Sequence, residues 1–487
     1  MIPTVDYIRI LPELVLSIFG IVVMLVDPLI PTHNSKKPLG ILALVGVLAG
    51  LAATACQACC FGDAFYHMVR VDAFSVFFHV VILLVALVVV LSSLDYLEVQ
   101  QIKAGEYYAL VLFATVGMTL MSSAIELVLI FIALEISSIS TYVLAGFRRR
   151  AAESAESSLK YFLLGSFATA FFLYGVAMMF GSTGSTNIYL IAEILKTHQT
   201  VLTYLAVALM FVGLGFKVAS APFHVWTPDV YEGAPAPVVG FMSTAPKAAA
   251  FAVLLRVLFA TGAPGWFWLV WVSAVLSMSI GNICALVQSN VKRLLAYSSI
   301  AHAGYMLVAV AAARTMGISA VMFYAASYAA MNVGAFAVVS HFANAGEKYV
   351  TLEDYAGLGK KSPVLAATFT FFLMSLIGIP ITGGFFAKFY VLNAVLKSGL
   401  NGLAIILVIN SALGAYYYLR IIVMMYMQES RSEVPVTAVP PAAGLALATC
   451  VLATLYLGVF PGRVLDFTTQ SARQLAHDPV TTLSLRQ

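Results

Sequence analysis

The stretch LIGIPITGGFFAKFYVL, residues 376–392, decides the fold because it combines two features that a membrane span normally lacks. Pro380 and the glycines around it interrupt a helix, and Lys388 places an ammonium group among apolar neighbours. Over the whole chain of 487 residues, 61% are hydrophobic and only 10% are charged. Such a chain has too few charges for an ordinary water-facing surface, so we predict an all-α integral membrane protein.

Apolar segments long enough to cross a bilayer follow one another along the chain. A bilayer core of about 30 Å needs about 20 apolar residues per helix. Cutting the sequence at polar and Pro/Gly clusters predicts fourteen transmembrane helices, near residues 8–28, 39–61, 72–94, 107–123, 125–147, 158–180, 202–233, 237–260, 264–286, 294–313, 317–344, 363–398, 401–427 and 438–460. The net charge of +4 is spread out, which gives no indication of nucleic-acid binding.

Basic residues in the loops predict the orientation. One face of the predicted fold holds most of them, namely Lys36, Lys37, Lys103, Arg148, Arg149, Arg150, Lys292, Arg293, Lys348, Lys360, Lys361 and Arg431. Because cytoplasmic loops carry an excess of Lys and Arg, this face is predicted to be cytoplasmic. An even number of spans then places both termini on the outer side.

Two of the predicted spans, 202–233 and 363–398, are too long for a single crossing and carry Pro222 and Pro380 near their middles. A helix broken inside the membrane is tolerated where its freed backbone groups are buried in protein or line a wet cavity. A pair of such breaks in corresponding positions indicates a transporter built from inverted repeats. We therefore predict an N-terminal three-helix segment (1–106), two five-helix repeats (107–260 and 264–427) and a last helix with a short tail (428–487). The alternative is a pair of accidental proline kinks.

Four ionisable side chains are predicted to lie deep in the membrane: Glu135, Lys217, Lys247 and Lys388. Each costs about 2.5–3.5 kcal/mol at the centre of a bilayer, which makes it a functional candidate. Burial disfavours a charged lysine and a nearby carboxylate favours it, so a lysine with a mobile carboxylate partner is a proton site of adjustable affinity.

Other polar residues allow two readings. Lys160 has Glu156 four residues before it, which is typical of a surface pair. His224, beside the first break, and His302 are candidates either to relay protons or to bond a freed carbonyl group. His79 is expected to be a packing residue, and Glu126 and Asp229 are expected to be helix-end groups.

Three stretches carry a family resemblance: APFHVWTPDVYEGAPAPVVGFMSTAPKAAAFA (221–252), GIPITGGFFAKFYV (378–391) and SLKYFLLGSFATAFFLYG (158–175). They resemble the antiporter-like membrane subunits of complex I, the proton-translocating NADH-quinone oxidoreductase. VYEGAP followed by APKAA resembles subunit N more than its sister subunits M and L. The IPIT of 379–382 departs from the double proline common in the family at this break.

The resemblance implies that quinone reduction elsewhere in the complex drives protons through this chain. It implies proton-transfer roles for Glu135, Lys160, Lys217, Lys247 and Lys388. It also implies that this chain binds no cofactor and that FMN and iron–sulfur clusters lie on other subunits, with quinone as the substrate of the complex. The expected partners are a neighbouring antiporter-like subunit, small membrane subunits and the lipid of a bacterial inner membrane.

Two further functions stay open at this point. The chain could belong to a multi-subunit sodium/proton antiporter, although VYEGAP and APKAA favour complex I. It could also be a passive membrane scaffold of a redox complex, in which case neutralising Lys217 or Lys388 would leave pumping intact.

Overall fold

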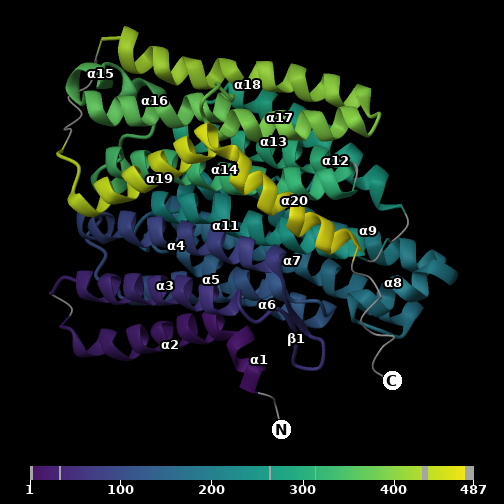
Figure 1. Ribbon diagram of the computed structural model, residues 1–487. Helices are drawn as coiled ribbons and strands as arrows, with labels where there is room; N and C mark the ends of the chain where they lie inside the picture. Colours follow the sequence, from purple (N-terminus) through teal and green to yellow (C-terminus); the bar gives the residue numbers. More distant parts are fainter. Residues whose placement is uncertain are drawn as a thin grey trace.

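The computed structural model describes residues 4–31, 34–260, 262, 265–312, 314–429 and 437–477. Most helices run side by side, with α2 (Leu11–Val26) and α3 (Lys37–Gln57) at one edge and α18 (Asn401–Met427) at the opposite edge (Figure 1). Within these residues, twelve helices are long and apolar enough to cross a membrane by length and composition. The all-α membrane fold is confirmed, whereas the count of fourteen spans stays a prediction.

The other elements follow in chain order. They are α1 (Thr4–Arg9), η1 (Asp27–Leu29), β1 (Gly62–Ala64), β2 (Val69–Val71), α4 (Ala73–Val99), α5 (Glu106–Ser123), α6 (Leu127–Ala145), α7 (Ala152–Thr183), α8 (Ile188–Thr197), α9 (Val201–Val218), α10 (Trp226–Gly233), α11 (Ala236–Leu255), the π-helix η2 (Arg256–Ala260), α12 (Trp266–Leu286), α13 (Val291–Ala311), α14 (Arg314–Phe342), η3 (Ala345–Glu347), η4 (Leu352–Tyr355), α15 (Leu358–Lys361), α16 (Pro363–Ile377), α17 (Gly383–Lys397), α19 (Pro441–Val459) and α20 (Pro461–His477).

Both over-long segments are broken, as predicted. The first divides into α9 and α10 around Pro222, and the second into α16 and α17 around Pro380. The elements that were not predicted include the antiparallel hairpin β1–β2, which pairs Asp63 with Arg70, and the helices α8 and α20. They escape a search for spans because the hairpin strands are three residues long and α8 and α20 are too short or too polar to cross a bilayer.

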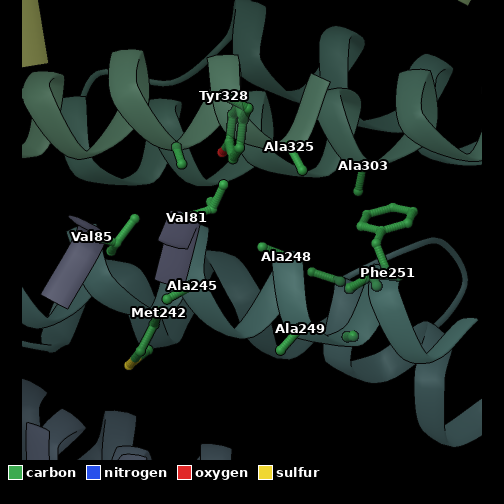
Figure 2. Packing of buried hydrophobic residues seen from close by; sticks show 14 of the residues in the cluster. Val81, Val85, Met242, Ala245, Ala248, Ala249, Phe251, Ala303, Ala325 and Tyr328 are labelled. Atoms are coloured by element: carbon green, nitrogen blue, oxygen red, sulfur yellow. The ribbon is translucent and has the colours of Figure 1, made fainter. Parts of the chain in front are cut away.

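Helix α11 lies at the centre of the core, and every one of its residues from Ala236 to Leu255 is buried. Small side chains occupy much of its surface. Figure 2 shows Ala245, Ala248 and Ala249 of α11 among residues of the neighbouring helices, including Val81 of α4 and Tyr328 of α14. Because alanines leave room for close approach, α4, α13 and α14 can pack against α11.

Loops that the basic-residue tally assigned to one face do lie together at one end of the bundle. The buried carboxylate of Glu347 binds Arg148 at 2.9 Å and Lys292 at 2.6 Å, and it also accepts hydrogen bonds from the Tyr96 hydroxyl and the backbone N–H of Ala236. One side chain therefore ties together four separate segments. Arg431, which belongs to the same tally, lies outside the described residues.

Candidate functional site

The first break is stabilised by side chains of α12. Helix α9 ends with Ala219 in the left-handed region, at φ 58°. The Ser277 hydroxyl accepts from the backbone N–H of Ala221 at 2.8 Å, and the Ser273 hydroxyl donates to the Ala221 carbonyl at 2.7 Å. Both backbone groups of Ala221 at this break are therefore satisfied inside the protein, which is what a membrane interior requires.

Lys217 lies in the last turn of α9, directly before this break, and is only 4% exposed. Its Nζ donates a hydrogen bond to the Ser138 hydroxyl of α6 at 2.8 Å. Glu135 lies one turn before Ser138 on the same helix face, and its Oε1 is buried without a hydrogen-bond partner in the described part of the chain. Lys217 thus bonds a serine one turn away from Glu135, and the described residues show no ion pair between the two charged groups.

Lys247 lies inside α11 and is 1% exposed. Its Nζ donates to the carbonyl oxygen of Ser299 at 3.0 Å and to the hydroxyl of the same residue. Ser299 belongs to α13, so this bond joins the last helix of the predicted first repeat to the predicted second repeat. The partners of the ammonium group are neutral, so the site has no carboxylate in direct contact among the described residues.

His302 continues this polar face of α13 one turn beyond Ser298. Its Nδ1 lies 2.7 Å from the Tyr324 hydroxyl and its Nε2 lies 3.2 Å from the Tyr418 hydroxyl. Tyr418 in turn bonds the Ser298 hydroxyl. The ring is 1% exposed, and the charges of Lys247 and Lys388 both act on it. His302 is bonded through hydroxyl groups that can both donate and accept hydrogen bonds.

Lys388 lies at the second break, in the second turn of α17. Its Nζ donates to the carbonyl oxygen of Ile377, the last residue of α16, at 2.8 Å and to the Ser411 hydroxyl at 3.1 Å. The same nitrogen lies 5.2 Å from the centre of the Tyr305 ring. Gly378 turns the chain at φ +94°, and a Cβ there would meet the Lys388 side chain at 3.2 Å. The break thus supplies an unpaired carbonyl group for the lysine.

Lys160 stands in a different environment, with its side chain 40% exposed. Its Nζ lies 2.7 Å from both Glu156 and Asp229, and Asp229 also binds Arg293 at 2.8 Å. The surface pair with Glu156 is present as the spacing predicted. Asp229 does more than cap a helix end, because it joins α7, α10 and α13.

Two further residues singled out in the sequence, His224 and Glu126, lie close to helix ends. His224 lies in the loop between α9 and α10, and its Nδ1 is buried without a partner among the described residues, which leaves one ring nitrogen unused. Glu126 caps α6 by accepting from the Leu129 backbone N–H at 2.6 Å, as expected of a helix-end group.

Sequence reasoning missed the neutral polar groups around the lysines. Asn282 donates to the Tyr305 hydroxyl at 3.0 Å, and the Tyr417 hydroxyl donates to Asn282 at 3.0 Å, all within the membrane region. A usable signal was the spacing of Ser298, His302 and Tyr305, which places all three on one face of a helix. In the described ranges, no group of three or more His, Cys, Asp or Glu residues could hold a metal ion.

Known proteins resemble this chain over nearly its full length. The family described as NADH:quinone oxidoreductase/Mrp antiporter, transmembrane, matches residues 124–414. NADH-quinone oxidoreductase subunit N 2 of Koribacter versatilis (strain Ellin345) is 69% identical over 483 residues, which cover 97% of this chain and 98% of the relative. Subunit N 1 of Solibacter usitatus (strain Ellin6076) is 49% identical over 96% of this chain and 98% of the relative.

One solved structure agrees with these relatives. A chain of the respiratory complex I from Thermus thermophilus with bound aureothin is 37% identical, with a TM-score of 0.81, over 93% of this chain and 98% of that chain. The protein belongs to the NADH:quinone oxidoreductase/Mrp antiporter family of membrane subunits. Within this family, its resemblance to subunit N of NADH-quinone oxidoreductase is confirmed.

Proposed function

We propose that this chain is the subunit N of a proton-translocating NADH-quinone oxidoreductase and carries protons through its buried lysines and Glu135. The observation that carries the proposal is the line Lys247, His302 and Lys388, which runs along α13 and ends at a broken helix. Lys247 and His302 are buried and Lys388 is part-buried, and each of the three ionisable groups bonds a hydroxyl group of a neighbouring helix. A scaffold has no need of such costly groups at membrane depth.

In this proposal, quinone reduction elsewhere in the complex acts on the pair formed by Glu135 and Lys217. In this arrangement Ser138 holds the ammonium group while Glu135 keeps a free oxygen. Movement of Glu135 toward or away from Lys217 changes the proton affinity of the lysine. Working against roughly 150 mV needs about 3.4 kcal/mol per proton, which one mobile counter-charge in a buried site can supply.

We assign proton transfer to Glu135, Lys217, Lys247 and Lys388, with Lys160, His224 and His302 as further members. The geometry of Lys160 fits an entry group, because it is partly exposed and shares Asp229 with Arg293. His224 fits a relay beside the first break because of its unused nitrogen. The proposed repeats are 107–260 and 264–427, flanked by the segments 1–106 and 428–487.

The same proposal defines the surroundings of the chain. Ile379 and Ile381 at the second break are 40% and 66% exposed. Non-helical backbone at membrane depth is tolerated only against protein or water, which supports a neighbouring membrane subunit over this break. FMN, iron–sulfur clusters and the quinone site are assigned to other subunits. The location is a bacterial inner membrane, with fourteen spans and both termini outside.

Inverted membrane vesicles that carry Lys217→Ala test the proposal. NADH-driven acidification and quinone reductase activity are followed together, and a native gel checks assembly. We expect an assembled complex in which both activities fall at least several-fold. The exposed Lys196→Ala serves as the control, because Lys196 pairs only with Glu193 on the surface of α8 in the described structure.

The two other functions predict different results. If acidification and reductase activity both stay at wild-type levels in an assembled Lys217→Ala complex, the chain is a passive scaffold. If the chain were part of a sodium/proton antiporter, the substitution would abolish sodium-dependent proton exchange without any dependence on NADH.

A further inference from the structure

A buried acid and a buried base lie next to each other outside the two proposed repeats. Glu13 of α2 is 7% exposed and His79 of α4 is fully buried, with Glu13 Oε1 at 3.6 Å from His79 Nε2. Both oxygens of Glu13 are buried without a hydrogen-bond partner in the described structure. A buried carboxyl group without partners must either find a counter-charge or hold a proton.

The tautomer of His79 is set by Gln57 of α3. The Gln57 side-chain N–H donates to the backbone carbonyl of Arg9, which turns Oε1 of the same amide toward the histidine. This Oε1 lies 3.1 Å from His79 Nδ1. Because an amide oxygen can only accept, Nδ1 carries a hydrogen in every charge state of the ring.

The other ring nitrogen has two partners on α5, one that can only accept a hydrogen bond and one that can donate. His79 Nε2 lies 3.0 Å from the Thr119 carbonyl oxygen and 2.8 Å from the Ser123 hydroxyl. A protonated ring donates from Nε2 to the carbonyl. A neutral ring accepts at Nε2 from the serine hydroxyl. Both charge states are therefore satisfied by the same surroundings, and the histidine is more than the packing residue that its sequence suggested.

The other charges near the ring are already paired. Asp72 and Arg256 both act on His79, but they bind each other at 2.7 Å, and Asp72 also accepts from the Ser75 N–H at the start of α4. Arg256 further donates to the Ser122 carbonyl at 3.0 Å. On the side of α1, Asp6 and Arg9 lie 3.5 Å apart.

Uncharged groups face the ring from α3 and α5, namely Gln57, Thr119 and Ser123. Among the described residues near His79, Glu13 is thus the acid that remains without a cation of its own.

We propose that Glu13 and His79 form a proton-binding site in the N-terminal three-helix segment, separate from the lysines of the two repeats. One proton occupies either Nε2 of the histidine, with Glu13 as the counter-charge, or the Glu13 carboxyl group, with a neutral ring held by Ser123. Protonation of both residues breaks the pair and leaves a positive charge.

Infrared difference spectroscopy of the purified complex during a pH titration tests this site without turnover. The signal is the carbonyl stretch of a protonated carboxylic acid, isolated as the wild-type spectrum minus that of Glu13→Gln. We expect this difference to contain one titrating carboxylic acid, and the exposed Glu193→Gln to leave the band unchanged. A difference spectrum without such a band would overturn the proposal.

Two further variants predict shifts of opposite sign. His79→Gln removes the positive neighbour, so the Glu13 band should persist to higher pH, by a tenfold change in proton affinity or more. Ser123→Ala removes the donor to the neutral ring and favours the charged one, so the band should appear only at lower pH. Ser123→Ala removes one oxygen atom and keeps the test available if His79→Gln fails to assemble. Midpoints that do not move, or that move in the same direction, would contradict a shared proton.

Discussion

Lys388 donates a hydrogen bond from Nζ to the carbonyl oxygen of Ile377 at 2.8 Å, across the break between α17 and α16. The carbonyl is free because Gly378 and Pro380 end the helix at this point. The lysine and the helix break would each destabilise a membrane helix alone, but here they form a hydrogen bond with each other. The lysine has a partner, and the carbonyl has a donor.

Replacing Lys388 tests whether this lysine carries protons. Lys388→Ala removes the terminal proton acceptor of the line and leaves the Ile377 carbonyl without its donor, at a cost of about 1–3 kcal/mol. We expect assembly to persist while NADH-driven acidification in vesicles falls at least tenfold. Lys397→Ala, at the exposed end of the same helix, is the matched control and should pump normally. Equal pumping in the two variants would refute a role for Lys388.

Close packing at the second break gives a test of the fold. A Cβ at Gly384 would lie 1.8 Å from the Ser375 carbonyl oxygen, which belongs to rigid backbone. Gly384→Ala should therefore displace α17 from α16 at a cost above the usual range of about 1–3 kcal/mol for overpacking. The expected result is loss of the assembled complex on a native gel.

Gly402 of α18 is the control for this substitution, because no atom lies within 4 Å of a Cβ added there. Gly402→Ala should assemble like the wild type, since alanine favours a helix over glycine by about 0.5–1 kcal/mol. Normal assembly of Gly384→Ala would show that the two half-helices are not held at this distance.

The sequence predicted the breaks and the deep lysines because both are costly features that stand out against an apolar background. It did not predict their partners. Ser138, Ser299 and Ser411 are ordinary residues for a helix, and only the packing of distant segments turns them toward the lysines. Glu13 was passed over because it lies near the end of its span, where a carboxylate is usually unremarkable. The hairpin and α20 were missed because neither contains a long run of apolar residues.

Substitution of Lys160 should affect proton transport without affecting the stability of the complex. Lys160→Ala leaves Asp229 paired with Arg293, and a solvent-exposed ion pair contributes little to stability. The complex should keep its thermal stability. If Lys160 is an entry group, acidification should nevertheless fall several-fold, and Lys160→Arg, which keeps the charge but does not release its proton, should not restore it. Full pumping in Lys160→Ala would leave only the surface-pair interpretation.

Glu347 predicts a dependence of stability on pH at the end of the bundle where the basic loops meet. Burial alone would raise the pKa of Glu347, but the Lys292 ammonium and the Arg148 guanidinium hold it below its usual value. A carboxylate with a lowered pKa contributes its full stability above the unfolded value of about 4.3 and loses it as the pH falls through the folded value.

Glu347→Gln removes this contribution at neutral pH and leaves the buried Lys292 and the part-buried Arg148 without their counter-charge, which costs about 3–5 kcal/mol. The temperature at which half of the chain leaves the complex, followed on native gels, should therefore fall at pH 7. The difference from the wild type should shrink as the pH falls below the unfolded value of about 4.3 and through the lower folded value, where the wild-type carboxylate also becomes neutral. Glu353→Gln, on the exposed start of η4, should match the wild type throughout. A difference that stays constant from pH 7 to acid would show that Glu347 acts by shape rather than by charge.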